Sequence, residues 1–374
     1  MKKIALITSG HPPTDERIFY KMGMTFIKYG YKVNIICSTL KVDKIVDGII
    51  LKGFDGSKLS KKEKAKLFYS YLNEYSPDIV ICCEPFTILP AYRYKKIRNK
   101  NAKIISDVTE WYPENVALKH KGIRKFISYA ELYLFNIYCT NHADAIIAGE
   151  EAKLKRYKII APQLKKEIIS YYPILKMFNY SPPPFDGKNL TLCYAGVVTF
   201  ERGILNLLEA AQKISKSNKS LSIRLKIVGK FSYENEEKIF REKVKNITDI
   251  SVELIPWGRY DEISEKISDV DICFDLRLNT FVYRNSLPIK IFEYMASGKP
   301  VVYSDIKPIR KELDVTKFGF MVDPENIEEI VSKVSLYIKD KDLLIKHSLE
   351  ARKQIENKFN WEMIEEKLIR FLES

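Results

Sequence analysis

The sequence predicts an α/β protein with two doubly wound parallel-sheet (Rossmann-like) domains, and three observations lead to this fold class. The first half alternates short β-rich runs with longer amphipathic runs, which is the pattern of βαβ units. A proline-rich stretch, Tyr172–Asn189, interrupts this pattern, and the same alternation then begins again. The length of 374 residues is also more than one ordinary core accommodates and indicates about two domains.

The individual elements follow from hydrophobic periodicity and from turn residues. In the first half we expect strands at Lys3–Thr8, Lys32–Cys37, Asp78–Cys82, Lys103–Asp107 and Asp144–Ala148. Helical periodicity lies between them, at Asp15–Tyr29, Lys61–Glu74, Thr87–Asn99 and Gly122–Asn141. In the second half we expect strands, each followed by a helical stretch, at Leu190–Ala195, Ile223–Val228, Ser251–Leu254, Asp271–Asp275 and Pro300–Tyr303.

These elements define the predicted domains. The first domain comprises residues 1–180, the second residues 189–357, and residues 181–188 form a proline-rich linker. The tail, 358–374, is an amphipathic helix with no strand left to accompany, so we expect it to cross back onto the first domain. Two such domains imply a cleft at the carboxyl ends of their strands, where open α/β sheets bind ligands.

Composition excludes several classes of protein. Apolar residues make up 46% and charged residues 29%, which is typical of a globular chain. No apolar run approaches the roughly 18 residues that span a bilayer, and the short run Ile4–Ile7 indicates a buried strand rather than a signal peptide. The six cysteines show no metal-ligand spacing, so we expect reduced core thiols of a cytoplasmic protein and no metal.

The net charge of +14 lies entirely in the first half. Residues 1–185 hold 31 Lys+Arg and 17 Asp+Glu (31 − 17 = +14), whereas residues 186–374 hold 31 of each (31 − 31 = 0). An anionic membrane face or a nucleic acid would explain this asymmetry, and a lysine-rich composition without any partner is the alternative. The positive residues cluster at 61–66, 93–100, 119–125 and 153–158.

The segment NSLPIKIFEYMASGKPVV, residues 285–302, is the most informative in the chain. It predicts a loop, a helix ended by Gly298, and a buried strand. Lys290 and Glu293 lie three residues apart in the first turns of that helix. A lysine at a helix start suits a phosphate, and a carboxylate one turn later suits sugar hydroxyls. A surface ion pair between the two side chains is the alternative.

Two loops of the first domain carry further candidates. Gly10 follows the first strand and lets the backbone approach a ligand, with no GxGxxG or P-loop spacing around it. Asp107 and Glu110 follow the strand from Lys103, at an edge that faces ligands in parallel sheets, with Trp111 beside them. They are candidates for orienting a sugar acceptor, and loop capping is the alternative.

The second domain offers three more features. Gly196 ends its first strand, and Arg202 stands at the start of the next helix, where its planar guanidinium suits a diphosphate. Trp257 and Tyr260 follow the strand from Ser251 and are placed to frame a flat base, although aromatics in such loops more often serve packing.

Together these segments resemble the GT-B glycosyltransferases, and within them the family-4-type retaining enzymes (glycosyl transferases group 1). The resemblance covers essentially the whole chain, through HPPTDERIFYKMGMTFIKYGYKV, DVTEWYPE, YAGVVTFERGILNLLEA and SLPIKIFEYMASGKPVV. The last is similar to the family's E-x7-E segment. It departs from it at Asn285, where the first glutamate is usual, and at Pro288, where a glycine is usual.

The resemblance implies roles for the candidate residues. Glu293 matches the second glutamate, which binds the ribose of a nucleotide sugar, and Arg202 and Lys290 match phosphate-binding positions that act in catalysis. Other positions matching the donor site are Gly10, Gly196, Trp257, Tyr260, Asn285 and Ser286.

The expected function is transfer of a sugar from a UDP- or GDP-linked donor to a glycan or lipid-linked acceptor, with retention, in cell-surface polysaccharide biosynthesis. No cofactor is expected beyond the donor substrate. The basic first domain fits peripheral association with an anionic membrane surface at the cytoplasmic side. The alternatives are another GT-B enzyme, such as a nucleotide-sugar epimerase, and a catalytically degenerate binding protein. Nucleic acid is the less favoured partner for such a protein.

Overall fold

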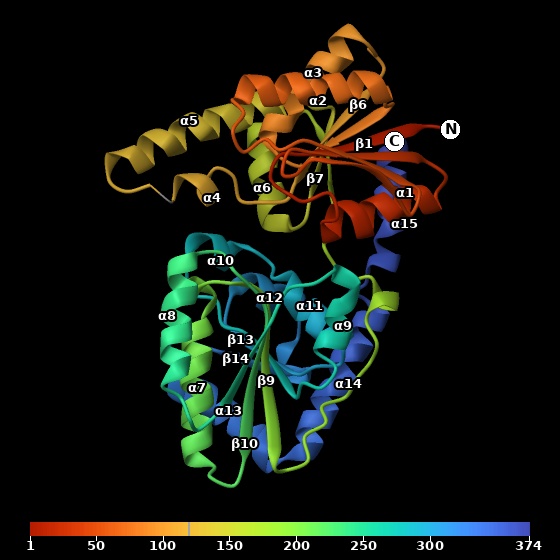
Figure 1. The fold of residues 1–374 in the computed structure, drawn as a ribbon. Helices are drawn as coiled ribbons and strands as arrows, with labels where there is room; N and C mark the ends of the chain where they lie inside the picture. Colours follow the sequence, from red (N-terminus) through yellow and green to blue (C-terminus); the bar gives the residue numbers. More distant parts are fainter. Residues whose placement is uncertain (119) are drawn as a thin grey trace. The chain divides into compact units, whose positions relative to one another are not determined.

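The computed structural model describes residues 1–118 and 120–374, so Lys119 of the third basic cluster lies outside the described residues. The chain divides into two compact units, each built on a largely parallel sheet (Figure 1). Unit 1 comprises Met1–Tyr171 and Ile364–Ser374, and unit 2 comprises Tyr172–Met363. The predicted α/β fold class is confirmed in both units.

Unit 1 contains an eight-stranded sheet in the order β3-β4-β2-β1-β5-β6-β7-β8. The strands are β1 (Lys3–Thr8), β2 (Lys32–Cys37), β3 (Val42–Val46), β4 (Ile49–Gly53), β5 (Ile79–Cys82), β6 (Lys103–Val108), β7 (Ala145–Ala148) and β8 (Lys165–Ile168). Neighbouring strands are parallel except for the pair β3 and β4. The carboxyl ends of the parallel strands therefore meet at one edge, where the loops after β1, β5 and β6 lie.

Helices cover both faces of this sheet. They are a π-helix, η1 (Glu16–Gly23), followed by α1 (Met24–Lys28), α2 (Lys61–Tyr75), α3 (Pro85–Ile97), α4 (Glu114–Ala117), α5 (Ile123–Thr140) and α6 (Glu151–Ile160). Phe68 of α2, Ile88 of α3 and Cys139 of α5 share one core with β1 and β5. Burial of these apolar side chains is the main driving force for assembling the layers.

The hairpin β3–β4 is absent from our sequence prediction. Its turn is Asp47-Gly48, and both residues have positive φ, at 50° and 80°. This is the backbone of a type I′ turn, for which Asp-Gly is a favoured pair. The Asp-Gly pair was the available signal, but the charged, exposed residues of β3 lack the apolar alternation by which strands are usually found.

Unit 2 contains a six-stranded parallel sheet in the order β11-β10-β9-β12-β13-β14. The strands are β9 (Asn189–Val198), β10 (Ser222–Phe231), β11 (Ser251–Ile255), β12 (Ile272–Asp275), β13 (Val301–Ser304) and β14 (Gly319–Val322). The helices are α7 (Ile204–Ser217), α8 (Glu234–Lys245), α9 (Ile263–Lys266), α10 (Phe281–Asn285), α11 (Ile289–Ala296), α12 (Lys307–Glu312), α13 (Ile327–Lys339) and α14 (Lys341–Asn357). Short 3₁₀ turns complete the unit at η2 (Leu175–Met177), η3 (Phe200–Arg202), η4 (Tyr260–Glu262), η5 (Val315–Lys317) and η6 (Trp361–Met363).

The proline-rich segment lies against unit 2. The amide of Asn179 donates to Ser264 Oγ at 2.9 Å, and that of Ser181 donates to the Ser297 carbonyl at 3.1 Å. Phe178 and Phe185, on either side of the three prolines, are almost fully buried. Unit 2 thus begins at Tyr172, earlier in the chain than the boundary at 180 that we predicted.

The C-terminal helix, α15 (Glu365–Glu373), belongs to unit 1 as predicted. Thr25 Oγ1 donates to Glu365 at 3.3 Å, and Tyr31 donates to Glu373 at 3.1 Å. Lys103 Nζ donates to the carbonyl of Leu372 at 3.1 Å. The apolar face of α15, with Leu368, Phe371 and Leu372 buried, closes the core of unit 1 after the chain has passed through unit 2.

All six cysteines are buried free thiols. Among the helices formed by residues 1–118 and 120–374, none has the length and apolar character required to cross a membrane.

Candidate active site

The carboxyl edge of the unit 2 sheet carries most of the predicted donor-site residues. β9 lies at the centre of the sheet, between β10 and β12, and is followed by η3 and the start of α7. The helix α11 packs on β12 and β13 and is joined to β9 through Tyr294. The hydroxyl of its Tyr294 accepts from the Ala195 amide at 2.8 Å and donates to the Ala195 carbonyl at 3.1 Å. These two bonds tie the second half of α11 to β9 at Ala195.

Lys290 extends across Gly196 at this edge. Gly196 has φ of +143°, and a Cβ placed on it would lie 1.5 Å from Lys290 Nζ. The ammonium lies 5.0 Å from the centre of the Trp257 ring and 5.8 Å from that of Tyr194. Burial and the positive charge of Arg202 lower the pKa of Lys290 to about 8, against the opposing effects of Glu293 and Asp275. A bound diphosphate would relieve this unfavourable burial of charge.

We expect Gly196→Ala to lower the transferase activity that the sequence resemblance implies by roughly tenfold or more, because the new methyl group displaces the Lys290 ammonium and L-residues are strained at this φ. Steady-state assays will measure the loss. Gly187→Ala is the matched control, since Gly187 also has positive φ (88°) but nothing within 4 Å of its added Cβ. Equal losses in the two variants would assign the effect to backbone strain and contradict the contact with Lys290.

Burial lowers the pKa of Arg202, which lies beside Lys290, but the neighbouring Tyr194, Tyr283 and Asp275 raise it above its ordinary value. The Nε of Arg202 is buried without a hydrogen-bond partner among the described residues. Gly203 directly after it has φ of +73°, and a Cβ there would lie 2.0 Å from the Leu276 carbonyl oxygen. The glycine therefore allows η3 to lie against the loop after β12. A buried, unpartnered guanidinium N–H next to a lysine is suited to an anionic oxygen.

A neighbouring ion pair was not found by our sequence analysis. Arg277, two residues after β12, donates from Nε to Asp275 at 2.8 and 3.0 Å in a buried position. The guanidinium groups of Arg277 and Arg202 lie 5.3 and 5.9 Å from the centre of the Tyr283 ring. The signal was the sequence DLR at a strand end, whose spacing alone does not distinguish it from a surface pair.

Glu293 is 3% exposed in α11. This burial contradicts the alternative of a surface ion pair between Lys290 and Glu293. The contact of Glu293 with a ribose stays a prediction.

The two predicted base-framing aromatics differ in their surroundings. Trp257 is 40% exposed and faces Lys290, so its ring is available to a ligand. Tyr260 is buried in η4 and packs edge-to-face on Phe178 at 5.6 Å. The packing alternative thus describes Tyr260, whereas Trp257 remains a candidate.

Asn285 and Ser286 end the helix α10. Asn285 Nδ2 donates to the Phe281 carbonyl at 2.7 Å, and Ser286 Oγ donates to the Val282 carbonyl at 2.8 Å. Both side chains therefore donate a hydrogen bond to a backbone carbonyl of their own helix. The side-chain carbonyl oxygen of Asn285 and the second hydrogen of its amide are left for the predicted contact with the nucleotide-sugar donor.

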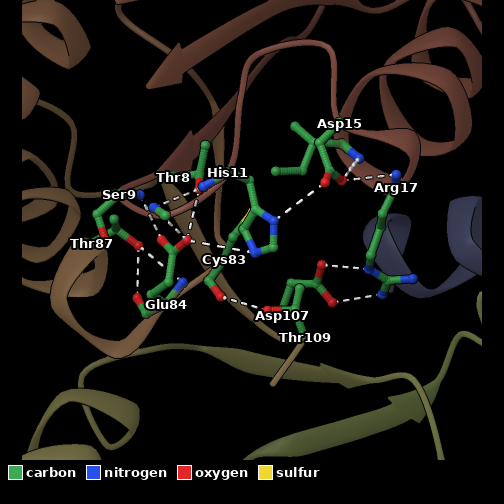
Figure 2. Close-up of polar contacts among 12 residues, drawn as sticks. Thr8, Ser9, His11, Asp15, Arg17, Cys83, Glu84, Thr87, Asp107 and Thr109 are labelled. Atoms are coloured by element: carbon green, nitrogen blue, oxygen red, sulfur yellow. Dashed lines mark hydrogen bonds and ion pairs between the residues drawn. The ribbon is translucent and has the colours of Figure 1, made fainter. Parts of the chain in front are cut away.

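In unit 1, the glycine loop after β1 is bound by a carboxylate from the same unit (Figure 2). Glu84, between β5 and α3, accepts from Thr8 Oγ1 at 2.7 Å, from the Ser9 amide at 2.8 Å and from the Gly10 amide at 3.0 Å. A Cβ on Gly10 would lie 3.2 Å from Glu84 Oε1. The Gly10 amide, which we predicted to approach the donor, thus donates to Glu84.

His11 lies between two carboxylates (Figure 2). Its Nδ1 is 3.2 Å from Asp15 and its Nε2 is 3.9 Å from Glu84. Burial alone would lower the pKa of His11, but the hydrogen bond and charge of Asp15, with the charges of Glu84 and Glu110, raise it to about 9. The imidazole is therefore a cation at neutral pH. Neither Glu84 nor His11 was among our predicted site residues, since their proximity depends on two loops about 75 residues apart.

Asp107 is buried in an ion pair. Arg17 donates to its two oxygens from Nε at 2.7 Å and from Nη2 at 2.6 Å (Figure 2). The two residues are 3% and 1% exposed, and the Arg17 guanidinium stacks 3.9 Å from the centre of the Tyr171 ring. We had predicted that Asp107 orients an acceptor. Since its carboxylate is buried and occupied, we correct this to a structural role in holding η1 on the sheet.

Glu110 is exposed and close enough to His11 to raise the pKa of that residue. Trp111 next to it is 6% exposed, and the Arg156 guanidinium covers its ring at 4.6 Å. Trp111 is therefore packed inside unit 1 rather than offered to a sugar. Of the predicted acceptor residues, Glu110 remains the one with an accessible carboxylate.

Comparison with known proteins agrees with this architecture. Residues 179–358, which lie in unit 2, match the family profile of the glycosyl transferases group 1. Residues 179–358 thus form a domain similar to this family, and the chain has the GT-B fold, as the sequence resemblance implied.

Two relatives are lipopolysaccharide 1,6-galactosyltransferases. The one from Escherichia coli is 24% identical over 81% of this chain and 78% of the relative. The one from Salmonella typhimurium is 28% identical over 47% of this chain, and the chain matches about half (46%) of that relative.

Two solved structures share the fold over the whole chain. Sucrose-phosphate synthase from Thermosynechococcus elongatus has a TM-score of 0.78 at 14% identity, covering 100% of this chain and 98% of that chain. HepE from Anabaena, in complex with UDP-glucose, has a TM-score of 0.74 at 13% identity, covering 100% of both chains.

Proposed function

We propose that this protein transfers a hexosyl group from a UDP- or GDP-linked sugar to a glycan or lipid-linked acceptor, with retention, in the assembly of a cell-surface polysaccharide. The observation that carries the proposal is the pair of cations at the carboxyl edge of unit 2. Lys290 lies across a glycine, and the buried Nε of Arg202 has no partner among the described residues. Two such cations at adjoining helix starts match the charge of a diphosphate.

In the proposed reaction, the bond between the sugar's anomeric carbon and the diphosphate oxygen breaks, and a bond from that carbon to the acceptor oxygen forms on the same face. The acceptor proton passes to the departing diphosphate. Negative charge grows on the diphosphate as it leaves, so Lys290 and Arg202 stabilise the transition state more than the ground state. Trp257 and Glu293 are proposed to hold the base and the ribose.

A UDP-linked hexose is the first donor to test. The GT-B neighbour HepE was solved with UDP-glucose, and two relatives are galactosyltransferases. The exposed Trp257 ring, 5.0 Å from Lys290 Nζ, offers a surface for the uracil base next to the phosphate-binding cations.

For the acceptor, we propose the edge of unit 1 where the exposed Glu110 and the cationic His11 lie. A carboxylate and an imidazolium together suit a hydroxylated, partly anionic glycan. The excess of +14 charges within residues 1–185 supports peripheral association with an anionic membrane surface at the cytoplasmic side, where a lipid-linked acceptor would be presented.

The donor assignment is tested by thermal shift with UDP-glucose, UDP-galactose, GDP-mannose and the free nucleotides. A donor at 100 times its Kd stabilises the folded protein by about 2.7 kcal/mol, so we expect a clear rise in Tm with one UDP-sugar. Glu293→Ala is expected to weaken that donor about tenfold or more. Glu209→Ala, which removes an exposed carboxylate of α7, is the matched control.

If none of these donors raises the Tm, the nucleotide-sugar proposal is overturned. Incubating the stabilising donor with and without glycan acceptors then separates transfer from epimerisation, because only transfer joins the labelled sugar to the acceptor.

A further inference from the structure

The helix α5 carries an apolar stripe that faces solvent. Ile123, Phe126 and Ile127 are 71%, 69% and 53% exposed, and Leu134 and Tyr138 are 65% and 57% exposed. Their spacing places them on one side of the helix, over about 24 Å at 1.5 Å per residue. In Figure 1, α5 runs outward from the sheet of unit 1, and its first turns lie at the tip of that projection.

The packing of unit 1 does not require this stripe. The opposite side of α5 supplies the buried residues, with Asn136 and Cys139 at 0% exposure. Tyr133 and Ile137 pack on a small core around Tyr157 of α6. A helix that is already anchored on one side and apolar on its solvent side presents an interaction surface.

The charges around the stripe indicate what covers it. Lys121 and Arg124 are exposed and Lys125 is half-buried, all at the end of α5 that carries Phe126 and Ile127. The exposed acidic residue of α5 is Glu131, one turn further along. Aromatic and aliphatic side chains flanked by cations are complementary to an anionic lipid surface, in which the apolar groups enter the interface and the cations meet the headgroups.

We propose that the α5 surface, formed by Ile123, Phe126, Ile127, Leu134 and Tyr138 with Lys121 and Arg124, is the part of this protein that docks on an anionic lipid bilayer. This inference rests on the membrane association within the proposed function and assigns that association to particular residues. The helix lies on the membrane and does not cross it. Docking through unit 1 would present the acceptor edge of that unit to lipid-linked glycans.

The test is flotation of the full chain with phosphatidylcholine vesicles that contain or lack phosphatidylglycerol. We expect binding to the anionic vesicles alone. Phe126→Ser/Ile127→Ser is expected to lower the partition coefficient at least tenfold. Ile159→Ser is the matched control, because Ile159 of α6 is 78% exposed outside the stripe, and it is expected to bind as the unaltered protein does.

A second pair of variants tests the electrostatic part of membrane binding. Lys121→Glu/Arg124→Glu is expected to weaken binding roughly fivefold for each lost cation, and added salt is expected to reduce the difference. Lys216→Glu/Lys219→Glu, in and just after α7, makes the same change in charge on unit 2 and is expected to bind normally. Circular dichroism verifies that each variant is folded.

The outcomes separate the two levels of the proposal. Failure of the unaltered protein to bind anionic vesicles would overturn the membrane association, while the donor assignment stands on its own thermal shifts. If Phe126→Ser/Ile127→Ser binds anionic vesicles as the unaltered protein does, the assignment to α5 is overturned, while the membrane association itself stands. Concentration-dependent dimerisation in sedimentation velocity that those substitutions abolish would assign the stripe to a second copy of the chain and likewise overturn lipid docking.

Discussion

Lys290→Ala is expected to lower kcat with a UDP-sugar donor by about 10²–10³-fold, because it removes a cation that meets the charge developing on the leaving diphosphate. Steady-state kinetics with donor and acceptor will measure the loss. Lys219→Ala, which removes an exposed cation of the same unit, is expected to retain activity. A loss below about threefold for Lys290→Ala would remove this residue from the catalytic groups.

The pH dependence distinguishes this role from a structural one. The pKa of Lys290 is lowered to about 8, so kcat/KM for the unaltered protein is expected to fall above that pH, and Lys290→Arg is expected to move the fall to higher pH. The free energy of unfolding depends on pH in the opposite direction. The unfolded state binds the additional proton between about pH 8 and the ordinary value of 10.5, so the lysine's effect on stability becomes less unfavourable as pH rises. Lys290→Ala should therefore lose activity without losing stability at pH 7.

Asp107→Asn is expected to lower the free energy of unfolding of unit 1 by about 3–5 kcal/mol. It leaves the buried Arg17 guanidinium without its counter-charge, and removing one member of a buried ion pair is far costlier than removing a surface one. Urea unfolding will measure the change in a Trp257→Phe/Trp361→Phe background, where Trp111 remains as the single tryptophan and reports on unit 1.

Two comparisons make this result specific. Asp43→Asn removes the partner of Lys52 in an exposed pair and is expected to cost at most about 1 kcal/mol. Arg17→Met/Asp107→Leu removes both charges and should be less destabilised than Asp107→Asn, since no buried charge is left unpaired. If Asp107→Asn costs no more than Asp43→Asn, the pair does not hold η1 on the sheet.

The contrast between Lys290 and Asp107 indicates how far local sequence patterns extend. Both were predicted as charged residues at the carboxyl edge of a parallel sheet, and both lie there. Lys290 lies beside Arg202 and above a glycine, and burial together with the charge of Arg202 lowers its pKa despite the opposing effects of Glu293 and Asp275. Asp107 meets an arginine 90 residues earlier in the chain, which occupies both its oxygens. Position along a strand is a local property, whereas the partner of a charge is not.

The partner of the Gly10 amide likewise depends on a segment distant in the chain. A glycine after the first strand predicts a close approach of some ligand to the amides, and an anion is indeed bound there. That anion is the carboxylate of Glu84, which follows the neighbouring strand β5, and the pattern around Gly10 does not reveal it.

The sequence by itself determined the α/β class, most strand positions and the family resemblance, because periodicity, turn residues and motif spacing are properties of short segments. The return of the C-terminal helix to unit 1 was inferred from the order of the elements, since no strand was left for that helix to accompany. Only the tertiary structure decided which candidate charged residues are paired within the protein and which are placed to bind a ligand. It also decided that Tyr260 and Trp111 are packed while Trp257 is exposed, and that α5 presents apolar side chains to solvent. These outcomes depend on contacts between segments distant in the chain, and burial and charge pairing arise only when such segments meet.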